Sequence, residues 1–112
     1  MADADKKIIF VGTSRADIRS FPEEARVAAG HQLRKVQKRQ DPDHYKPMGT
    51  VGSGVYEITI NLDDAYRVFY VAKFADVIYV LHAFQKTTRK TAQSDIDLGR
   101  KRYATVVLSR KS

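Results

Sequence analysis

Three runs of strand-forming residues decide the fold: Val55-Tyr-Glu-Ile-Thr-Ile-Asn61, Tyr66-Arg-Val-Phe-Tyr-Val-Ala-Lys-Phe74 and Val77-Ile-Tyr-Val-Leu-His-Ala-Phe-Gln85. Valine, isoleucine, tyrosine and phenylalanine are abundant in all three, and these residues favour β-strands. Only Leu62-Asp-Asp-Ala65 and Ala75-Asp76 separate the runs. Connections this short join antiparallel neighbours, so we expect a three-stranded meander.

The second turn determines which residues of the last two strands face each other, because strand side chains alternate between the faces of a sheet. A two-residue turn at Ala75-Asp76 places Arg67 opposite Phe84. The same register pairs Phe69 with His82 and Phe74 with Val77. Since Ala75 tolerates a positive φ poorly, a four-residue turn with the same register is an open alternative.

The first turn determines which residues accompany Arg67. A two-residue turn would place Ile58 and Ile60 beside it, whereas a three-residue turn over Leu62–Asp64 would place Glu57 and Thr59 there. We prefer the three-residue turn, because it collects apolar side chains on one buried face and leaves the charges on the other. The expected buried residues are Tyr56, Ile58, Ile60, Val68, Tyr70, Tyr79 and Leu81.

Outside the meander, local signals predict the remaining elements. Lys7–Val11 is a β-branched run that predicts a strand, and Ser20-Phe-Pro-Glu23 has the form of a helix-opening capping box. We expect helices over about 14–20, 21–39 and 93–107, a loop over 41–54, and an inner helical stripe of Ala25, Ala29, Leu33 and Val36. The prediction is a single α+β domain over 1–112, with flexible tails at 1–6 and 108–112. Its small antiparallel sheet contains the N-terminal strand and the meander, two N-terminal helices cover one face, and a C-terminal helix follows.

The charge is distributed unevenly. The chain has 112 residues and a formal net charge of +7, all of which arises in residues 66–112. A one-sided positive field suggests a polyanionic partner, either nucleic acid or an acidic protein; a merely solvated basic face is the alternative. No apolar run approaches the roughly 20 residues that span a bilayer, and the N-terminus lacks a signal-peptide apolar segment, so we expect a cytoplasmic protein without membrane association.

The polar face of the predicted sheet carries the candidate chemistry. It would hold Glu57, Thr59, Arg67, Phe69, Lys73, His82, Phe84 and Lys86. Arginine fits a phosphate, lysine provides a mobile charge, histidine titrates near neutrality and phenylalanine can stack on a base. Such a surface could bind and cleave RNA without a metal.

Each of these residues also has a structural interpretation. Arg67 could pair with Glu57, His82 could be a half-buried core residue, and the cations from Lys86 to Lys90 could be a solvated loop. The chain has no cysteine, its histidines show no ligand spacing, and Asp95 and Asp97 would not face each other on a helix. We therefore expect neither a metal site nor a cofactor.

Several motifs, in order, give the chain a family resemblance. They include Tyr66-Arg-Val-Phe-Tyr70, Val77-Ile-Tyr-Val-Leu-His-Ala-Phe-Gln-Lys86, Asp95-Ile-x-Leu-x-Arg-x-Arg102, Ser14-Arg-x-Asp-Ile-Arg-x-Phe-Pro-Glu23 and Lys46-Pro-Met-Gly-x-x-x-Gly-x-Val-Tyr-Glu57. Over about residues 8–105 the chain closely resembles the phage-derived branch of the RelE/HigB toxin superfamily. Thr87 and Ala92 stand where that family more often has a second lysine and a proline.

The resemblance implies a microbial-RNase-like RelE fold and the toxin of a type II toxin–antitoxin pair. Members are typically ribosome-dependent mRNA endonucleases, neutralised by a helix-turn-helix antitoxin that also binds operator DNA, so the toxin meets that DNA only indirectly. The implied catalytic residues are Arg67, His82, Lys86 and Lys90. The expected RNA-binding residues are Lys73, Phe69, Phe84, Arg89, Arg100 and Arg102. The alternative is a non-catalytic basic module, such as a degenerate toxin, that binds nucleic acid or a protein partner.

Overall fold

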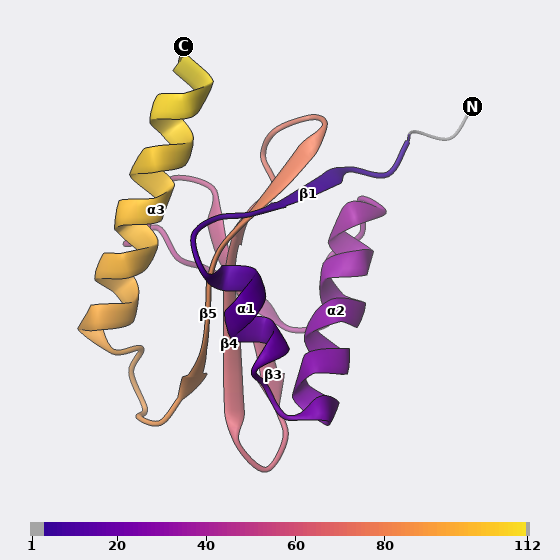
Figure 1. Cartoon of the computed structure of the whole chain (residues 1–112), viewed down its shortest axis with the longest axis vertical. Helices are drawn as coiled ribbons and strands as arrows, with labels where there is room; N and C mark the ends of the chain where they lie inside the picture. Colours follow the sequence, from indigo (N-terminus) through magenta and orange to yellow (C-terminus); the bar gives the residue numbers. More distant parts are fainter. Residues whose placement is uncertain (1–3, 112) are drawn as a thin grey trace.

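The computed structural model describes residues 4–111 and has a mixed sheet between two helical layers. Helices α1 and α2 lie on one side of the sheet and α3 lies on the other (Figure 1). In chain order the elements are β1 (Lys7–Phe10), α1 (Ser14–Arg19), α2 (Glu23–Gln37), β2 (Tyr45–Pro47), β3 (Val55–Asn61), β4 (Ala65–Val71), β5 (Val77–Lys86) and α3 (Gln93–Lys111). The predicted α+β class is therefore confirmed.

The sheet has five strands in the order β1-β5-β4-β3-β2. The expected meander forms its centre, and β1 pairs with β5. That pairing is parallel, so the expectation of a wholly antiparallel sheet is wrong. The fifth strand, β2, lies within the segment predicted as a loop, where its three residues pair with β3 along the sheet edge.

The three-residue turn over residues 62–64 is confirmed, since Asn61 faces Ala65 across β3 and β4. As a result, Thr59 lies opposite Arg67 and Glu57 opposite Phe69. The predicted pairs of Phe69 with His82 and of Arg67 with Phe84 are also confirmed between β4 and β5.

The register of β4 and β5 shifts by one residue after these pairs, because a β-bulge leaves Tyr70 opposite Val80 instead of Leu81. The pairing of Phe74 with Val77 is therefore wrong: β4 ends at Val71, and five residues connect it to β5. Since a one-residue shift reverses the faces, Tyr79 and Leu81 lie on the α3 side, not in the predicted α2-facing core.

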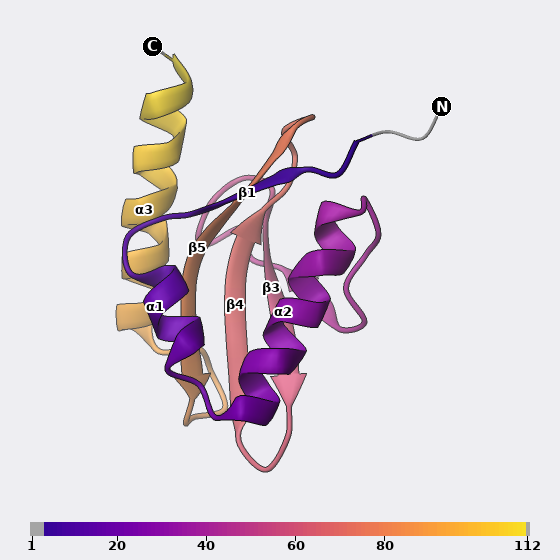
Figure 2. The ribbon, with the colours of Figure 1, turned by 45° about the vertical axis from the view of Figure 1, so that its right-hand side comes forward.

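The α2 side holds the core that the sequence predicts. Ala25, Ala29, Leu33 and Val36 form a buried stripe on α2 and pack against Ile58, Ile60, Val68 and Tyr70 of the sheet. Figure 2 shows α2 beside β3. The predicted capping box is absent: Ser20 Oγ instead donates to Ala16 O, 2.9 Å away in α1, and α2 begins after Pro22 with no side-chain cap. Pro22 occupies the N-cap position, and Glu23 and Glu24 place negative charge in the first turn, where it favours the N-terminus of a helix.

The opposite face of the sheet differs most from the sequence prediction. It was expected to be open, but α3 covers it and encloses a second core that includes Val71, Leu81, Phe84 and Val106. Gly99 makes this close approach possible, because a Cβ there would lie 2.9 Å from Phe69 Cδ2. The polar and aromatic surface of the sequence prediction is thus largely an interface between the sheet and α3.

The chain ends are more ordered than predicted where the structure describes them. Residues 108–111 continue α3, and Lys6 N donates to Gln37 O at 2.8 Å. The other residues predicted as tails, 1–3 and 112, lie outside the described residues. Within 4–111, no helix is long and apolar enough to cross a membrane.

Candidate functional site

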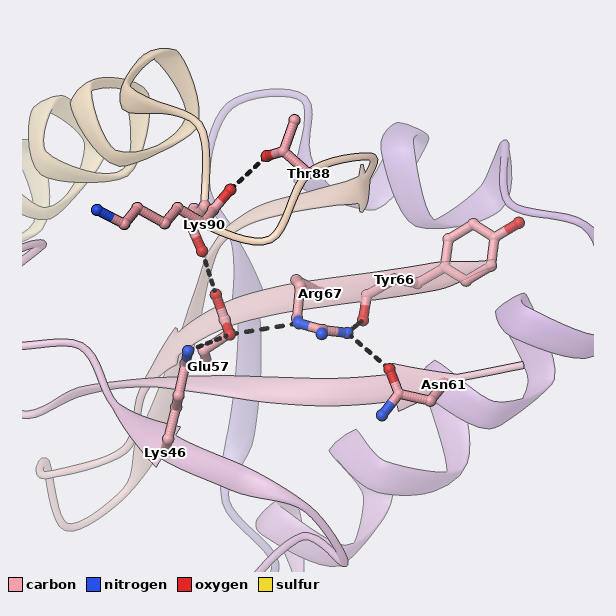
Figure 3. Close-up of polar contacts among 8 residues, drawn as sticks. Lys46, Glu57, Asn61, Tyr66, Arg67, Thr88 and Lys90 are labelled. Carbon is pink, nitrogen blue, oxygen red and sulfur yellow. Dashed lines mark hydrogen bonds and ion pairs between the residues drawn. The ribbon is translucent and has the colours of Figure 1, made fainter. Parts of the chain in front are cut away.

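Arg67 occupies the middle of the candidate site on β4. Its Nη1 donates to Asn61 Oδ1 at 3.2 Å and to Tyr66 O at 2.9 Å, and its Nε lies 3.4 Å from Glu57 Oε1 (Figure 3). Its side chain retains 10% of its exposure. The pairing with Glu57 that the sequence allowed is therefore present, and the guanidinium is held in a fixed orientation.

Glu57 is a fully buried carboxylate that gathers partners from three other segments. Besides Arg67, Lys46 of β2 places Nζ 3.6 Å from Oε1 (Figure 3). Thr91 Oγ1 donates to Oε2 at 3.2 Å. A buried charge is stable only with such partners. Sequence reasoning missed Lys46, Thr91 and Asn61 in this cluster, because strand alternation describes neither the β2 edge nor the path of the loop after β5.

His82 is buried on the α3 side of β5. Its Nε2 lies 2.7 Å from Asp95 Oδ1 in the first turn of α3, and the ring stacks on Phe84 with centroids 4.9 Å apart. Its Nδ1 is buried without a hydrogen-bond partner. The sequence analysis did not identify Asp95 as this partner. The available signal was an acidic residue in the first turn of the helix that follows the strand containing His82.

The aromatic residues expected to stack on RNA bases do not present open faces. Phe69 is fully buried and Phe84 is 8% exposed. Their rings contact each other edge to face, with centroids 5.1 Å apart, beneath α3. Both therefore pack the second core in this structure, and a base could reach them only after α3 moves.

The cations predicted around Arg67 divide into two groups. Lys86 is half-buried at the end of β5, on the face that the register shares with Arg67, and Arg89 and Lys90 are exposed in the loop that follows. Figure 3 shows the Lys90 side chain extending away from Arg67 and Glu57. Thr88 Oγ1 donates to the Lys90 carbonyl, and this hydrogen bond restrains the backbone of the loop.

The second group of predicted cations lies away from Arg67. Lys73 follows β4 and donates to Tyr103 OH at 3.0 Å, roughly 20 Å along the strand direction from Arg67. Arg102 donates to Leu81 O at 2.9 Å and to Thr13 Oγ1 at 3.0 Å, and it occupies the space above Gly12. Arg100 is exposed on α3. The predicted RNA-binding residues thus do not form one surface.

The groups at the site are suited to phosphate chemistry. Among residues 4–111 there is no group of three or more histidine, aspartate or glutamate side chains that could hold a metal ion. What the structure brings together is an oriented guanidinium, a buried carboxylate and a cationic loop. These groups can bind a phosphate, stabilise charge on it and exchange a proton with a nearby hydroxyl.

The comparisons with known proteins add one finding to this geometry. The family described as phage-derived protein Gp49-like (DUF891) matches residues 16–104, most of the chain. The match extends from α1 to α3 and contains both Arg67 and Glu57. None of the curated proteins matches the chain.

Proposed function

Because the chain belongs to the phage-derived Gp49-like family, which is toxin-like and of the RelE/HigB type, we propose that it is the toxin of a type II toxin–antitoxin system. Its activity is metal-independent cleavage of mRNA on the translating ribosome. The observation that carries this proposal is the position of Arg67, which is oriented by Asn61 and Tyr66 on the face from which the basic loop after β5 emerges.

The proposed reaction is attack of a ribose 2′-hydroxyl on the adjacent phosphate. A bond forms between the 2′-oxygen and phosphorus while the bond to the leaving 5′-oxygen breaks, which yields a cyclic phosphate and a 5′-hydroxyl. Arg67 stabilises the charge that develops on the phosphate. One proton leaves the 2′-hydroxyl and one is delivered to the 5′-oxygen, so the site needs a base and an acid.

The contacts favour particular residues for these roles. Glu57 is the carboxylate nearest to Arg67 and is the candidate base. Lys86 is the candidate acid, because it lies at the end of β5 on the same face. Lys90 and Arg89 would bind flanking phosphates. His82, which contacts Asp95, is the other candidate for proton transfer, and the same contact joins α3 to β5.

The partners of this function are the ribosome with its mRNA and a cognate helix-turn-helix antitoxin. Operator DNA would be contacted only through the antitoxin. The net charge of +7, which arises wholly in residues 66–112, supports a polyanionic partner. Ribosomal RNA and an acidic antitoxin segment would both satisfy it.

The test is primer extension on mRNA from cells that express wild type, Arg67→Ala or Arg67→Lys at matched protein levels. We expect new cuts within translated reading frames for the wild type and none for Arg67→Ala. Arg67→Lys keeps a cation beside Glu57 and so protects the fold, but it loses the planar guanidinium; we expect at least a tenfold reduction in cleavage.

The matched control is Arg26→Ala, which removes an exposed arginine from α2 on the other side of the sheet. Its cleavage pattern should equal that of the wild type. Unchanged cleavage in a folded Arg67→Ala variant would refute the assignment, and so would the absence of cuts in the wild type.

One observation favours the alternative of a non-catalytic binding module. Arg67 already has three partners and its side chain is 10% exposed, and Phe69 is closed beneath α3, so a substrate has little access to either residue. A binding module would arrest growth without new mRNA cuts. Its affinity would fall by similar amounts as exposed basic residues are removed one at a time.

A further inference from the structure

A second site lies on the opposite side of the sheet, where the end of α2 approaches β3 and β4. This pocket has a volume of about 410 Å³, within the range of small-molecule sites. The residues that line it include three tyrosines and three cationic residues. They are Tyr45, Tyr56, Tyr70, Lys6, Arg39 and Lys73. Asp41 is the acidic residue among the described residues that line it.

The pocket is separate from the Arg67 site. Tyr70 is three residues after Arg67 on β4, so the two side chains point to opposite faces of the sheet. Tyr56 and Tyr70 pack with the α2 side of the core, whereas Phe69 packs with the α3 side. A ligand in the pocket would therefore not touch Arg67 or Glu57.

The tyrosines form a continuous aromatic wall. The Tyr56 and Tyr70 rings stack with centroids 6.1 Å apart, and Tyr45 meets Tyr56 edge to face at 5.5 Å. Tyr45 is 39% exposed, so the wall opens to solvent at the β2 edge. Burial and then the neighbouring Tyr45, Asp41 and Tyr56 raise the pKa of Tyr70, which keeps its hydroxyl neutral and able to donate.

Contacts already orient the cations of the pocket: Lys73 Nζ donates to Tyr103 OH at 3.0 Å and Arg39 Nη2 donates to Ala4 O at 3.3 Å. Arg39 follows α2 with φ 65°, a conformation for which glycine is the usual residue at a helix end. Gly54 has φ 81°, and a Cβ there would come within 2.9 Å of Lys73 Cδ. Lys6 Nζ donates to Ala72 O at 2.6 Å, and burial is the main cause of its lowered pKa.

We propose that this pocket binds a nucleoside phosphate, with the base against the tyrosine wall and the phosphate near Arg39 and Lys73. The volume accommodates about one nucleotide, stacking on tyrosine suits any base, and the cationic side chains in the lining favour an anion. The ligand is either a free nucleotide or one nucleotide of an RNA strand. This inference goes beyond the proposed cleavage and does not require it.

The test is a titration of the full chain, followed by two-dimensional amide NMR, with adenosine monophosphate, adenosine, inorganic phosphate and a tetraadenylate ribonucleotide. We expect shifts at the amides around the pocket and a Kd for the monophosphate at least tenfold lower than for adenosine or phosphate alone. A tetranucleotide that binds at least tenfold more tightly would identify an RNA strand as the source; equal affinity would identify the free nucleotide.

Two variants make the proposal falsifiable. Tyr45→Ala should weaken nucleotide binding about tenfold, whereas Tyr45→Phe keeps the ring and should bind nearly as well. Arg39→Gly should weaken binding of the monophosphate but not of adenosine. Because glycine suits a positive φ, the backbone gain offsets part of the loss of the contact between Arg39 and Ala4 O. Arg26→Ala is the cation control.

The proposal is overturned if millimolar nucleotide causes no shifts, if the shifts map to the Arg67 face, or if Tyr45→Ala and Arg39→Gly bind like the wild type. These results are independent of mRNA cleavage, because Arg67→Ala should bind the mononucleotide with unchanged affinity.

Discussion

At the scale of single residues, one buried carboxylate organises the candidate site. Glu57 is fully buried and contacts Arg67, Lys46 and Thr91, so four separate segments depend on one charge. Removing one member of a buried pair is costly, because the other charge stays buried without its partner. Glu57 therefore has a structural role whether or not it also accepts a proton from RNA.

Glu57→Gln should lower the free energy of unfolding by about 3 kcal/mol, because Arg67 would remain buried without its counter-charge. Urea unfolding followed by circular dichroism measures this change. The matched control is Asp5→Asn, which removes the carboxylate of an exposed pair with Arg34 at 2.8 Å. Exposed pairs contribute about 0 to 1 kcal/mol, so equal losses in the two variants would contradict a stabilising role for the buried pair.

At the scale of elements, α3 lies close against the sheet because Gly99 has no side chain. A Cβ on Gly99 would lie 2.9 Å from Phe69 Cδ2 and 3.0 Å from Val51 Cγ1, so the helix backbone rests directly on the second core. The contact between His82 and Asp95 ties the first turn of α3 to β5. The position of α3 therefore controls access to Phe69 and Phe84.

Gly99→Ala should destabilise the protein by about 1 to 3 kcal/mol, although alanine is the better helix former, because Phe69 and Val51 must move. Gly30 in the middle of α2 is the matched control, since a Cβ there meets nothing within 4 Å. Gly30→Ala should stabilise the protein by roughly 0.5 to 1 kcal/mol. Thermal unfolding of both variants checks the pair, and a stabilised Gly99→Ala would show that α3 does not pack as closely as described.

At the scale of the whole molecule, the two central strands hold both cores together. β4 and β5 have a hydrogen-bonded strand on each side and face buried side chains on both sheet surfaces, whereas β2 is a three-residue edge strand with all its residues exposed. Local openings should therefore be rarest in the centre and commonest at the β2 edge.

Amide hydrogen exchange followed by NMR should show the slowest exchange in β4 and β5 and much faster exchange in β2. The reason is that central amides exchange only when most of the fold opens, while edge amides need only a local opening. Slow exchange in β2 together with fast exchange in β5 would contradict this arrangement of the sheet.

The sequence by itself determined most of the local elements, though not β2, and half of the register. Alternation and the three-residue turn placed Arg67 opposite Thr59, because both are encoded in neighbouring residues. The predicted pairing of Arg67 with Phe84 is confirmed although the predicted two-residue turn is wrong, because the bulge compensates for the longer connection. The tertiary structure decided the rest. The bulge that moves Leu81 to the α3 face, the parallel pairing of β1 and the covering of Phe69 by α3 depend on contacts between distant segments. Gly99 carries no apolar signal of its own; its small size becomes informative only once its neighbours Phe69 and Val51 are known.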